Sequence, residues 1–164
     1  MGSGKTSVGK RVAKSLGYKF IDLDKVIESE AGISINEIFD QFGEEHFRTL
    51  EKNSLDKLVD STNTVISTGG GTPCYQNNMN LMNANGITVY LQLNEETLFQ
   101  RLKDAKVQRP LIKNHSDEEL KAFIKDKLKE RLPFYSEAQH KVDAQHVSNA
   151  VEKISELSRK ENLL

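Results

Sequence analysis

Gly4, Lys5 and Thr6 stand near the start of the chain in the order that ends the phosphate-binding loop G-x-x-x-x-G-K-[ST]. In such a loop, backbone amides at a helix N-terminus hold phosphate oxygens. The lysine reaches the outer phosphates and the hydroxyl group contributes a ligand to Mg²⁺. We therefore expect the stretch from Gly2 through Ser3 to Thr6 to bind the phosphates of a nucleotide, with Thr6 also serving a metal ion.

The front half of this motif is absent from the chain. Its first glycine would fall two residues before Met1, and a hydrophobic strand should lead into the loop. Our interpretation is that the native start lies upstream of Met1, so that the first strand of the fold is missing here. Neighbouring strands would then keep unpaired backbone groups, and the chain as written is expected to fold poorly. An N-myristoylation pattern and an expression scar are the simpler alternatives for this opening.

Two carboxylates, Asp22 and Asp24, close the β-prone run "YKFIDLD". Alternation along an extended chain would put both side chains on the same side. A phosphoryl-transfer site needs an acid near its metal, so we expect Asp22 to orient Mg²⁺, through water, and Asp24 to accept a hydrogen bond from an attacking hydroxyl. The alternative is that Asp24 caps the helix beginning "KVIESE"; the two roles are compatible.

Three consecutive glycines, Gly69, Gly70 and Gly71, follow the strand-like run "TVIST". Glycines at a strand end let a ligand approach the main chain closely, although a merely permissive loop would read the same way. Arginine Arg109 stands beside Pro110 in an aperiodic segment, which is typical of a lid that closes over phosphates. The sequence thus predicts an anion site assembled from loops.

The elements that must position these residues alternate between strand and helix. Capping boxes at Ser34 and Ser116 start two helices, Gly43 is expected to end the first, and Pro133 to interrupt the second. The runs "TVIST" and "ITVYLQL" are predicted strands, a weak strand is expected near Lys141–Asp143, and a closing helix at Val147–Leu157. This order predicts an α/β fold with a parallel sheet covered by helices on both faces, and ligands beyond the carboxyl ends of the strands.

Composition limits the partners. The 164 residues fit one domain, and the net charge of −1 gives no reason to expect nucleic acid or an anionic membrane. The single cysteine, Cys74, cannot form an intramolecular disulfide, and neither it nor the 4 histidines have metal-ligand spacing. No apolar run approaches a membrane span and no signal peptide is present. A cytoplasmic single-domain protein is the expectation.

Six segments in this order resemble those of shikimate kinase: "GSGKT", "FIDLD", "IFDQFGEEHFRTLE", "STGGGTP", "RPL" and "ERLPFY". The similarity runs from Gly2 to about Tyr135. It implies a P-loop kinase fold like that of nucleoside monophosphate kinases, with residues 1–164 as one kinase domain and a mobile lid near residues 105–116. It also implies transfer of the ATP γ-phosphate to the 3-hydroxyl of shikimate in aromatic amino-acid biosynthesis, by a monomer that uses Mg²⁺.

The resemblance further implies a role for each matching position. Lys5 and Thr6 would serve the ATP phosphates and Mg²⁺, Asp22 would support the metal, and Asp24 would hold the shikimate hydroxyls and act as the base. The carboxylate of shikimate would pair with two arginines, which suit bidentate recognition, and the pocket would be lined by glycines and two apolar walls: Arg48, Arg131, Gly69, Gly70, Gly71, Phe39 and Phe47. Arg109 would be the lid arginine, and Arg101 is a candidate contact for adenine.

Two other functions stay open at this point. One is a kinase for another small metabolite, such as gluconate or a nucleoside monophosphate, although those lack the pairing of Arg48 with the triple glycine. The other is a non-catalytic nucleotide-binding module, inactive because its front is missing. Binding of nucleotide without turnover would favour the module.

Overall fold

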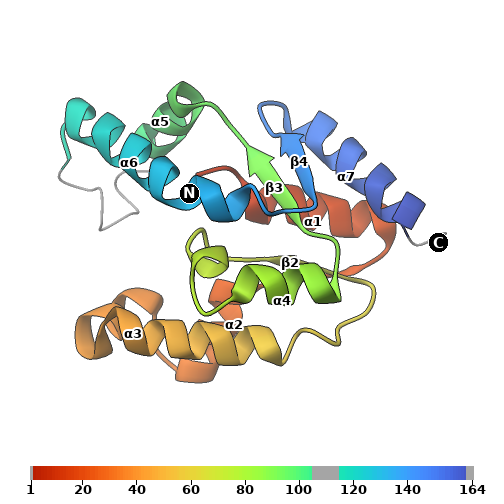
Figure 1. Ribbon diagram of the computed structural model, residues 1–164, viewed down its shortest axis with the longest axis horizontal. Coiled ribbons are helices and arrows are strands. Elements are labelled where there is room, and N and C mark those ends of the chain that lie inside the picture. Colours follow the sequence, from red (N-terminus) through yellow and green to blue (C-terminus); the bar gives the residue numbers. More distant parts are fainter. Residues whose placement is uncertain (1, 105–114, 162–164) are drawn as a thin grey trace.

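The computed structural model of the protein describes residues 2–104 and 115–161 (Figure 1). Helices and strands alternate along it, as the sequence predicts for an α/β fold. The first half contains α1 (Lys5–Leu16), β1 (Lys19–Asp22), α2 (Leu23–Ala31), α3 (Ile35–Asp56), β2 (Thr64–Ser67) and the short 3₁₀ helix η1 (Thr72–Cys74). The second half contains α4 (Asn78–Asn85), β3 (Val89–Gln92), α5 (Glu95–Asp104), α6 (Asp117–Tyr135), β4 (His140–Asp143) and α7 (Val147–Glu161).

The strands pair in parallel, which confirms the predicted pairing, but they form two separate sheets. β1 lies beside β2, with Lys19 opposite Thr64, and β3 lies beside β4, with Val89 opposite His140. Within the described part of the chain, β2 is paired only with β1 and β3 only with β4. Among the described residues, β2 and β3 therefore each have one edge without a strand partner.

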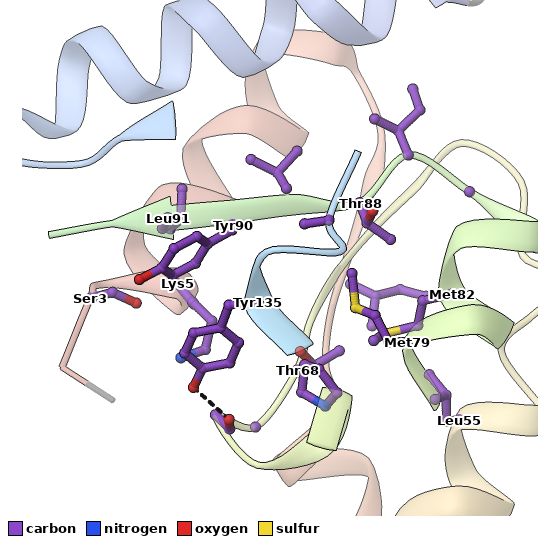
Figure 2. A pocket seen from close by; sticks show the side chains of 18 of the residues that line it. Ser3, Lys5, Leu55, Thr68, Met79, Met82, Thr88, Tyr90, Leu91 and Tyr135 are labelled. Atoms are coloured by element: carbon purple, nitrogen blue, oxygen red, sulfur yellow. Dashed lines mark hydrogen bonds between the residues drawn. The ribbon is translucent and has the colours of Figure 1, made fainter. Parts of the chain in front are cut away.

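A cavity of about 280 Å³ borders both sheets (Figure 2). Ile66 of β2 and Tyr90 of β3 contribute to its lining, and it reaches Lys5 and Gly70. Apolar side chains from α3 and α4 complete much of the wall, among them Leu55, Met79 and Met82. That a strand belongs ahead of the phosphate loop stays a prediction.

The described residues form two apolar cores. The larger core joins α1 and α7 to β3, β4, α5 and α6, and includes Val8, Val12, Leu102, Leu120 and Ile124. The smaller core joins α2 to α3, and includes Leu23, Ile27, Ile38, Phe47 and Leu55. In Figure 1 the elements of the smaller core lie in the lower part with β2 and α4, and α5, α6 and α7 lie in the upper part. The larger core thus positions the start of α1, and the smaller core positions α2 and α3.

Three local expectations meet the structure differently. The strand prediction for Asp24 is wrong, because β1 ends at Asp22 and Asp24 lies in the first turn of α2. Gly43 interrupts the helical geometry as predicted, at φ 80°, and the helix expected in the following segment resumes at once, so that α3 is two helical stretches joined at a kink. Pro133 does not end α6, which continues to Tyr135. Pro133 has no N–H to donate to the helix ladder, and α6 ends two residues after it.

The smaller predictions hold. Ser34 and Ser116 each cap a helix through a complete capping box with Glu37 and Glu119. The weak strand near Lys141–Asp143 is β4. Among the helices of residues 2–104 and 115–161, none combines the length and the apolar character that crossing a membrane requires.

Candidate active site

The phosphate loop, residues 2–6, leads directly into α1. Gly4 takes the left-handed conformation, φ 85° and ψ 23°, at the N-cap position, where a residue with a Cβ would be strained. It provides no side-chain cap, and the first turn of α1 carries no acidic residue. The positive end of the helix dipole and the first-turn amides are therefore not covered by a carboxylate of that turn, as an anion site requires.

Thr6 and Asp22 bring two oxygen groups together beside this loop. The Thr6 hydroxyl donates a hydrogen bond of 2.9 Å to Asp22 Oδ2. Asp22 is the last residue of β1, so the end of that strand meets the start of α1. The structure thus joins two residues that are 16 positions apart in sequence.

The carboxyl group of Asp24 has an environment unlike that of an exposed acid. Burial raises its pKa above the usual 3.8, and the negative charges of Asp22 and Glu51 raise it further. The positive charge of Lys5 opposes this rise. Asp24 therefore lies within electrostatic reach of the phosphate loop on one side and of α3 on the other.

Arg48 of α3 is almost fully buried, with 9% of its surface exposed. Its Nη1 donates to Glu51 Oε2 at 2.7 Å, and its Nη2 donates to Glu44 Oε1 at 2.9 Å. The guanidinium carbon lies 4.0 Å from the centre of the Tyr75 ring. Burial alone would lower the pKa of Arg48, but its bonds to Glu51 and Glu44 outweigh burial and raise it. The guanidinium is thus held in one orientation.

The glycine loop, Gly69 to Gly71, runs between these charged groups. A Cβ built on Gly71 would lie 2.7 Å from Arg48 Nη2. One built on Gly69 would lie 3.2 Å from Asp24 Oδ1 and 3.2 Å from Glu51 Oε1. The loop therefore lies close to both the arginine and the acid, and this close approach accounts for glycine at positions 69 and 71.

Arg131 of α6 belongs to the same neighbourhood. Burial raises the pKa of the Cys74 thiol, and the positive charges of Arg131 and Arg48 both oppose that rise. Two arginines from different helices thus act on one side chain just beyond the glycine loop. Arg48 and Arg131 therefore both lie within electrostatic reach of Cys74.

The remaining predicted residues fall in different places. Phe47 is buried and Phe39 is 36% exposed, with ring centres 4.7 Å apart, so the two form one aromatic pair on α3. Arg101 donates to the carbonyl oxygens of Ser3 and Ala144, so it ties the phosphate loop to the segment after β4. Arg109 and most of the predicted lid lie outside the described residues.

Several residues of this site were missed in the sequence. Glu51 is 1% exposed and accepts hydrogen bonds from Arg48 and, at 2.5 Å, from the Thr72 hydroxyl. Its spacing of three from Arg48 in "FRTLE" is a detectable signal, because such residues share a helix face. Tyr75 and Tyr135 carry no such signal, because their contacts come from distant segments.

Comparison with known proteins identifies the family of the chain. A family profile described as shikimate kinase matches residues 1–160. A shikimate kinase from Parabacteroides distasonis is 45% identical, with 94% of each chain covered. One from Bacteroides thetaiotaomicron is 43% identical over 164 residues, which are 100% of this chain and 94% of the relative.

Solved structures give the same answer for the fold. The 1.7 Å crystal structure of shikimate kinase from Bacteroides thetaiotaomicron aligns with a TM-score of 0.92 and 42% identity, covering 97% of this chain and 94% of that one. Shikimate kinase from Acinetobacter baumannii in complex with shikimate aligns with a TM-score of 0.88 and 34% identity, covering 100% and 91%.

Proposed function

This chain belongs to the shikimate kinase family, and from that premise we propose which of its residues carry out the family's reaction. The protein transfers the γ-phosphate of ATP to the 3-hydroxyl of shikimate, giving shikimate 3-phosphate and ADP, in aromatic amino-acid biosynthesis. The Acinetobacter baumannii relative was solved in complex with shikimate, which supports shikimate as the acceptor.

One observation carries the proposal for the acceptor site. Gly71 lies against the guanidinium of Arg48, and Gly69 lies against the carboxyl group of Asp24. A small acid with neighbouring hydroxyls needs a fixed cation for its carboxylate and an acceptor for its hydroxyls. We assign the carboxylate of shikimate to Arg48 and Arg131, its hydroxyls to Asp24, and the lining of its pocket to the glycine loop with Phe39 and Phe47.

In the proposed mechanism Asp24 takes the proton of the 3-hydroxyl as that oxygen bonds to the γ-phosphorus. The bond between the γ-phosphorus and the bridging oxygen breaks, and ADP leaves with the electron pair. Lys5 and the amides of the phosphate loop stabilise charge on the transferring group. We also propose that Arg109 adds positive charge near the phosphates, and that Arg101 contacts the nucleotide.

The oxygens of Thr6 and Asp22 fit a magnesium ion. They are hard ligands in hydrogen-bond contact at 2.9 Å beside the phosphate loop. Within residues 2–104 and 115–161 no group of three or more acidic, histidine or cysteine side chains forms a metal cluster. Mg²⁺ in kinases needs none, because substrate phosphates and water supply most of its ligands. Thr6 and Asp22 would hold the ion, which would offset the negative charge of the phosphate groups.

The experiment is ADP release from ATP and Mg²⁺, with and without shikimate, for the wild-type chain and for Asp24→Asn. Asparagine cannot take the proton, so turnover is expected to fall about 10²- to 10⁴-fold, while the dissociation constant for ATP stays the same. Asp60→Asn, the same chemical change at an exposed position, is the control.

Each outcome decides between the open functions. Shikimate-dependent ADP release that Asp24→Asn abolishes supports the assignment. Near-normal turnover of Asp24→Asn would remove Asp24 from the role of base. Tight ATP binding with no turnover in the wild-type chain would favour a non-catalytic nucleotide-binding module. A monomer stays a prediction, which size-exclusion chromatography with light scattering would check.

A further inference from the structure

Tyr135 is the last residue of α6 and reaches the glycine loop. Its hydroxyl donates a hydrogen bond of 2.6 Å to the carbonyl oxygen of Gly70, across 65 positions of sequence (Figure 2). Its ring lies 4.9 Å from the ring of Tyr90 on β3, centre to centre, at an angle of 33°. The ring is thus anchored on the strand and the hydroxyl on the loop.

The carbonyl of Gly70 belongs to the same planar peptide group as the N–H of Gly71. A bond that fixes the direction of this carbonyl therefore limits rotation of the peptide that precedes the Gly71 Cα. That Cα is the part of the loop that lies against Arg48, since an added Cβ would stand 2.7 Å from Nη2. The hydroxyl of Tyr135 thus acts, through one peptide, on the wall beside the buried guanidinium.

Tyr135 also connects to the second arginine. It follows Arg131 by four residues in α6, so the two share a helix face. Burial raises the pKa of the Tyr135 phenol, and the charge of Arg131 and a hydrogen bond with it oppose that rise. The phenol therefore stays protonated near neutral pH and available as a donor.

We propose that Tyr135 is a positioning residue that fixes the Gly70–Gly71 peptide and so holds Arg48 and Arg131 in register for the carboxylate of the acceptor. This inference rests on the proposed function, because it assigns the two arginines to that carboxylate. Tyr135 itself touches the loop and the arginine rather than the reacting atoms. Its effect should therefore appear in acceptor binding and leave nucleotide binding alone.

The test is Tyr135→Phe, which removes one oxygen and keeps the ring against Tyr90. Loss of one such bond is expected to weaken shikimate binding about three- to tenfold. The dissociation constants for shikimate and for ATP are measured by calorimetric titration, with the KM values alongside. The constant for ATP is expected to change less than about twofold, because no bond at the phosphate loop is removed.

Tyr90→Phe is the matched control. It belongs to the same ring pair, and among the described residues its hydroxyl has no hydrogen-bond partner. Both dissociation constants should stay near wild type in this variant. A thermal melt of both variants measures any general loss of stability. Only Tyr135→Phe is expected to change shikimate binding.

Arg131→Ala separates failure of this inference from failure of the proposed function. If Arg131→Ala weakens shikimate binding and Tyr135→Phe does not, the positioning role is wrong and the acceptor site stands. If neither variant changes shikimate binding, the acceptor site is wrong and the inference falls with it. Equal weakening of shikimate and ATP binding in Tyr135→Phe would also overturn the inference, since it would indicate general loosening.

Discussion

Gly4 and Arg48 are each suited to an anion, but the chain prepares them in opposite ways. Around Gly4 the donors are backbone amides at the start of α1, in a loop that contains two left-handed glycines, Gly2 and Gly4. Around Arg48 the donor is a buried side chain, which Glu44 and Glu51 orient and the Tyr75 ring covers. The first site is made by neighbouring residues, and the second by α3, the glycine loop and η1 together.

The two sites differ in their cost in free energy. An amide carries no net charge, so the phosphate loop can lie open without a counter-ion. A buried guanidinium must keep partners, because an unpaired charge in the interior is strongly destabilising. Arg48, Glu51, Thr72 and the glycine loop form the proposed carboxylate pocket, and the buried ion pair within it is expected to contribute to folding as well. Substitutions in this pocket should affect stability far more than changes in the phosphate loop.

The largest loss of stability is expected for Glu51→Ala, which tests whether the site around Arg48 depends on its buried partners. The change leaves Arg48 Nη1 and the Thr72 hydroxyl without their buried acceptor. Breaking a buried pair from one side is expected to lower the free energy of unfolding by about 3–5 kcal/mol. Urea unfolding measures this loss, and the affinity of the remaining folded protein for ATP should be unchanged.

Lys25→Ala provides the control for Glu51→Ala. Lys25 and Glu28 have the same spacing of three and the same 2.7 Å separation as Arg48 and Glu51, but the Lys25 side chain is 77% exposed. No measurable loss of stability is expected there, because solvent screens such a pair. Equal losses in the two variants would break the contrast between the two regions.

A smaller effect is expected for Gly71→Ala. Its backbone angles, φ −91° and ψ −21°, suit alanine, so any penalty comes from space alone. The new Cβ would stand 2.7 Å from Arg48 Nη2, and Arg48 cannot move without loosening its bonds to Glu44 and Glu51. Shikimate binding is expected to weaken about tenfold, the scale of one charged hydrogen bond, as measured by titration.

Gly86→Ala is the matched control at a strand-like glycine. Gly86 has φ −179°, and nothing lies within 4 Å of its built Cβ. Shikimate affinity should not change. Wild-type affinity in Gly71→Ala as well would mean that Arg48 yields to the new methyl group, and that the carboxylate pocket is not rigid.

The smallest effect is expected in the pH dependence of activity and stability. It comes from Asp24, which lies within electrostatic reach of both the phosphate loop and α3. Because the pKa of Asp24 is raised above 3.8, chiefly by burial, the acid limb of kcat/KM should lie at higher pH than for an exposed aspartate. The folded protein holds this proton more tightly than the unfolded chain does. The stabilisation that protonation of Asp24 contributes is therefore fully present below pH 3.8. It is lost as the pH rises through the pKa of Asp24 in the folded protein.

Melting temperatures of the wild type and Asp24→Asn at a series of pH values check this sign. The asparagine variant should gain stability relative to the wild type as pH rises from about 4 toward 7. A difference that does not vary with pH, or that varies in the opposite direction, would show that the Asp24 carboxyl group is not held in a destabilised charged state.

The local order of the chain determined much of the fold. The capping boxes at Ser34 and Ser116, the strands around "TVIST" and "ITVYLQL", and their parallel pairing all followed from side-chain periodicity and turn chemistry. Predictions failed where a neighbour in space overrode the local pattern. Asp24 alternates with Asp22 as in a strand, but the chain turns into α2 after Asp22, and Leu23 enters the smaller core.

The phosphate loop could be identified from the sequence alone, because it needs only consecutive residues: a left-handed glycine, the first amides of a helix, a lysine and a hydroxyl. It also determined which residue types could bind a carboxylate. Packing between distant segments placed Gly71 against Arg48, the Thr72 hydroxyl on Glu51, and the Tyr135 hydroxyl on the carbonyl of Gly70. Those contacts join residues 21 and 65 positions apart, and packing of helices from two cores sets such distances, which no local pattern encodes.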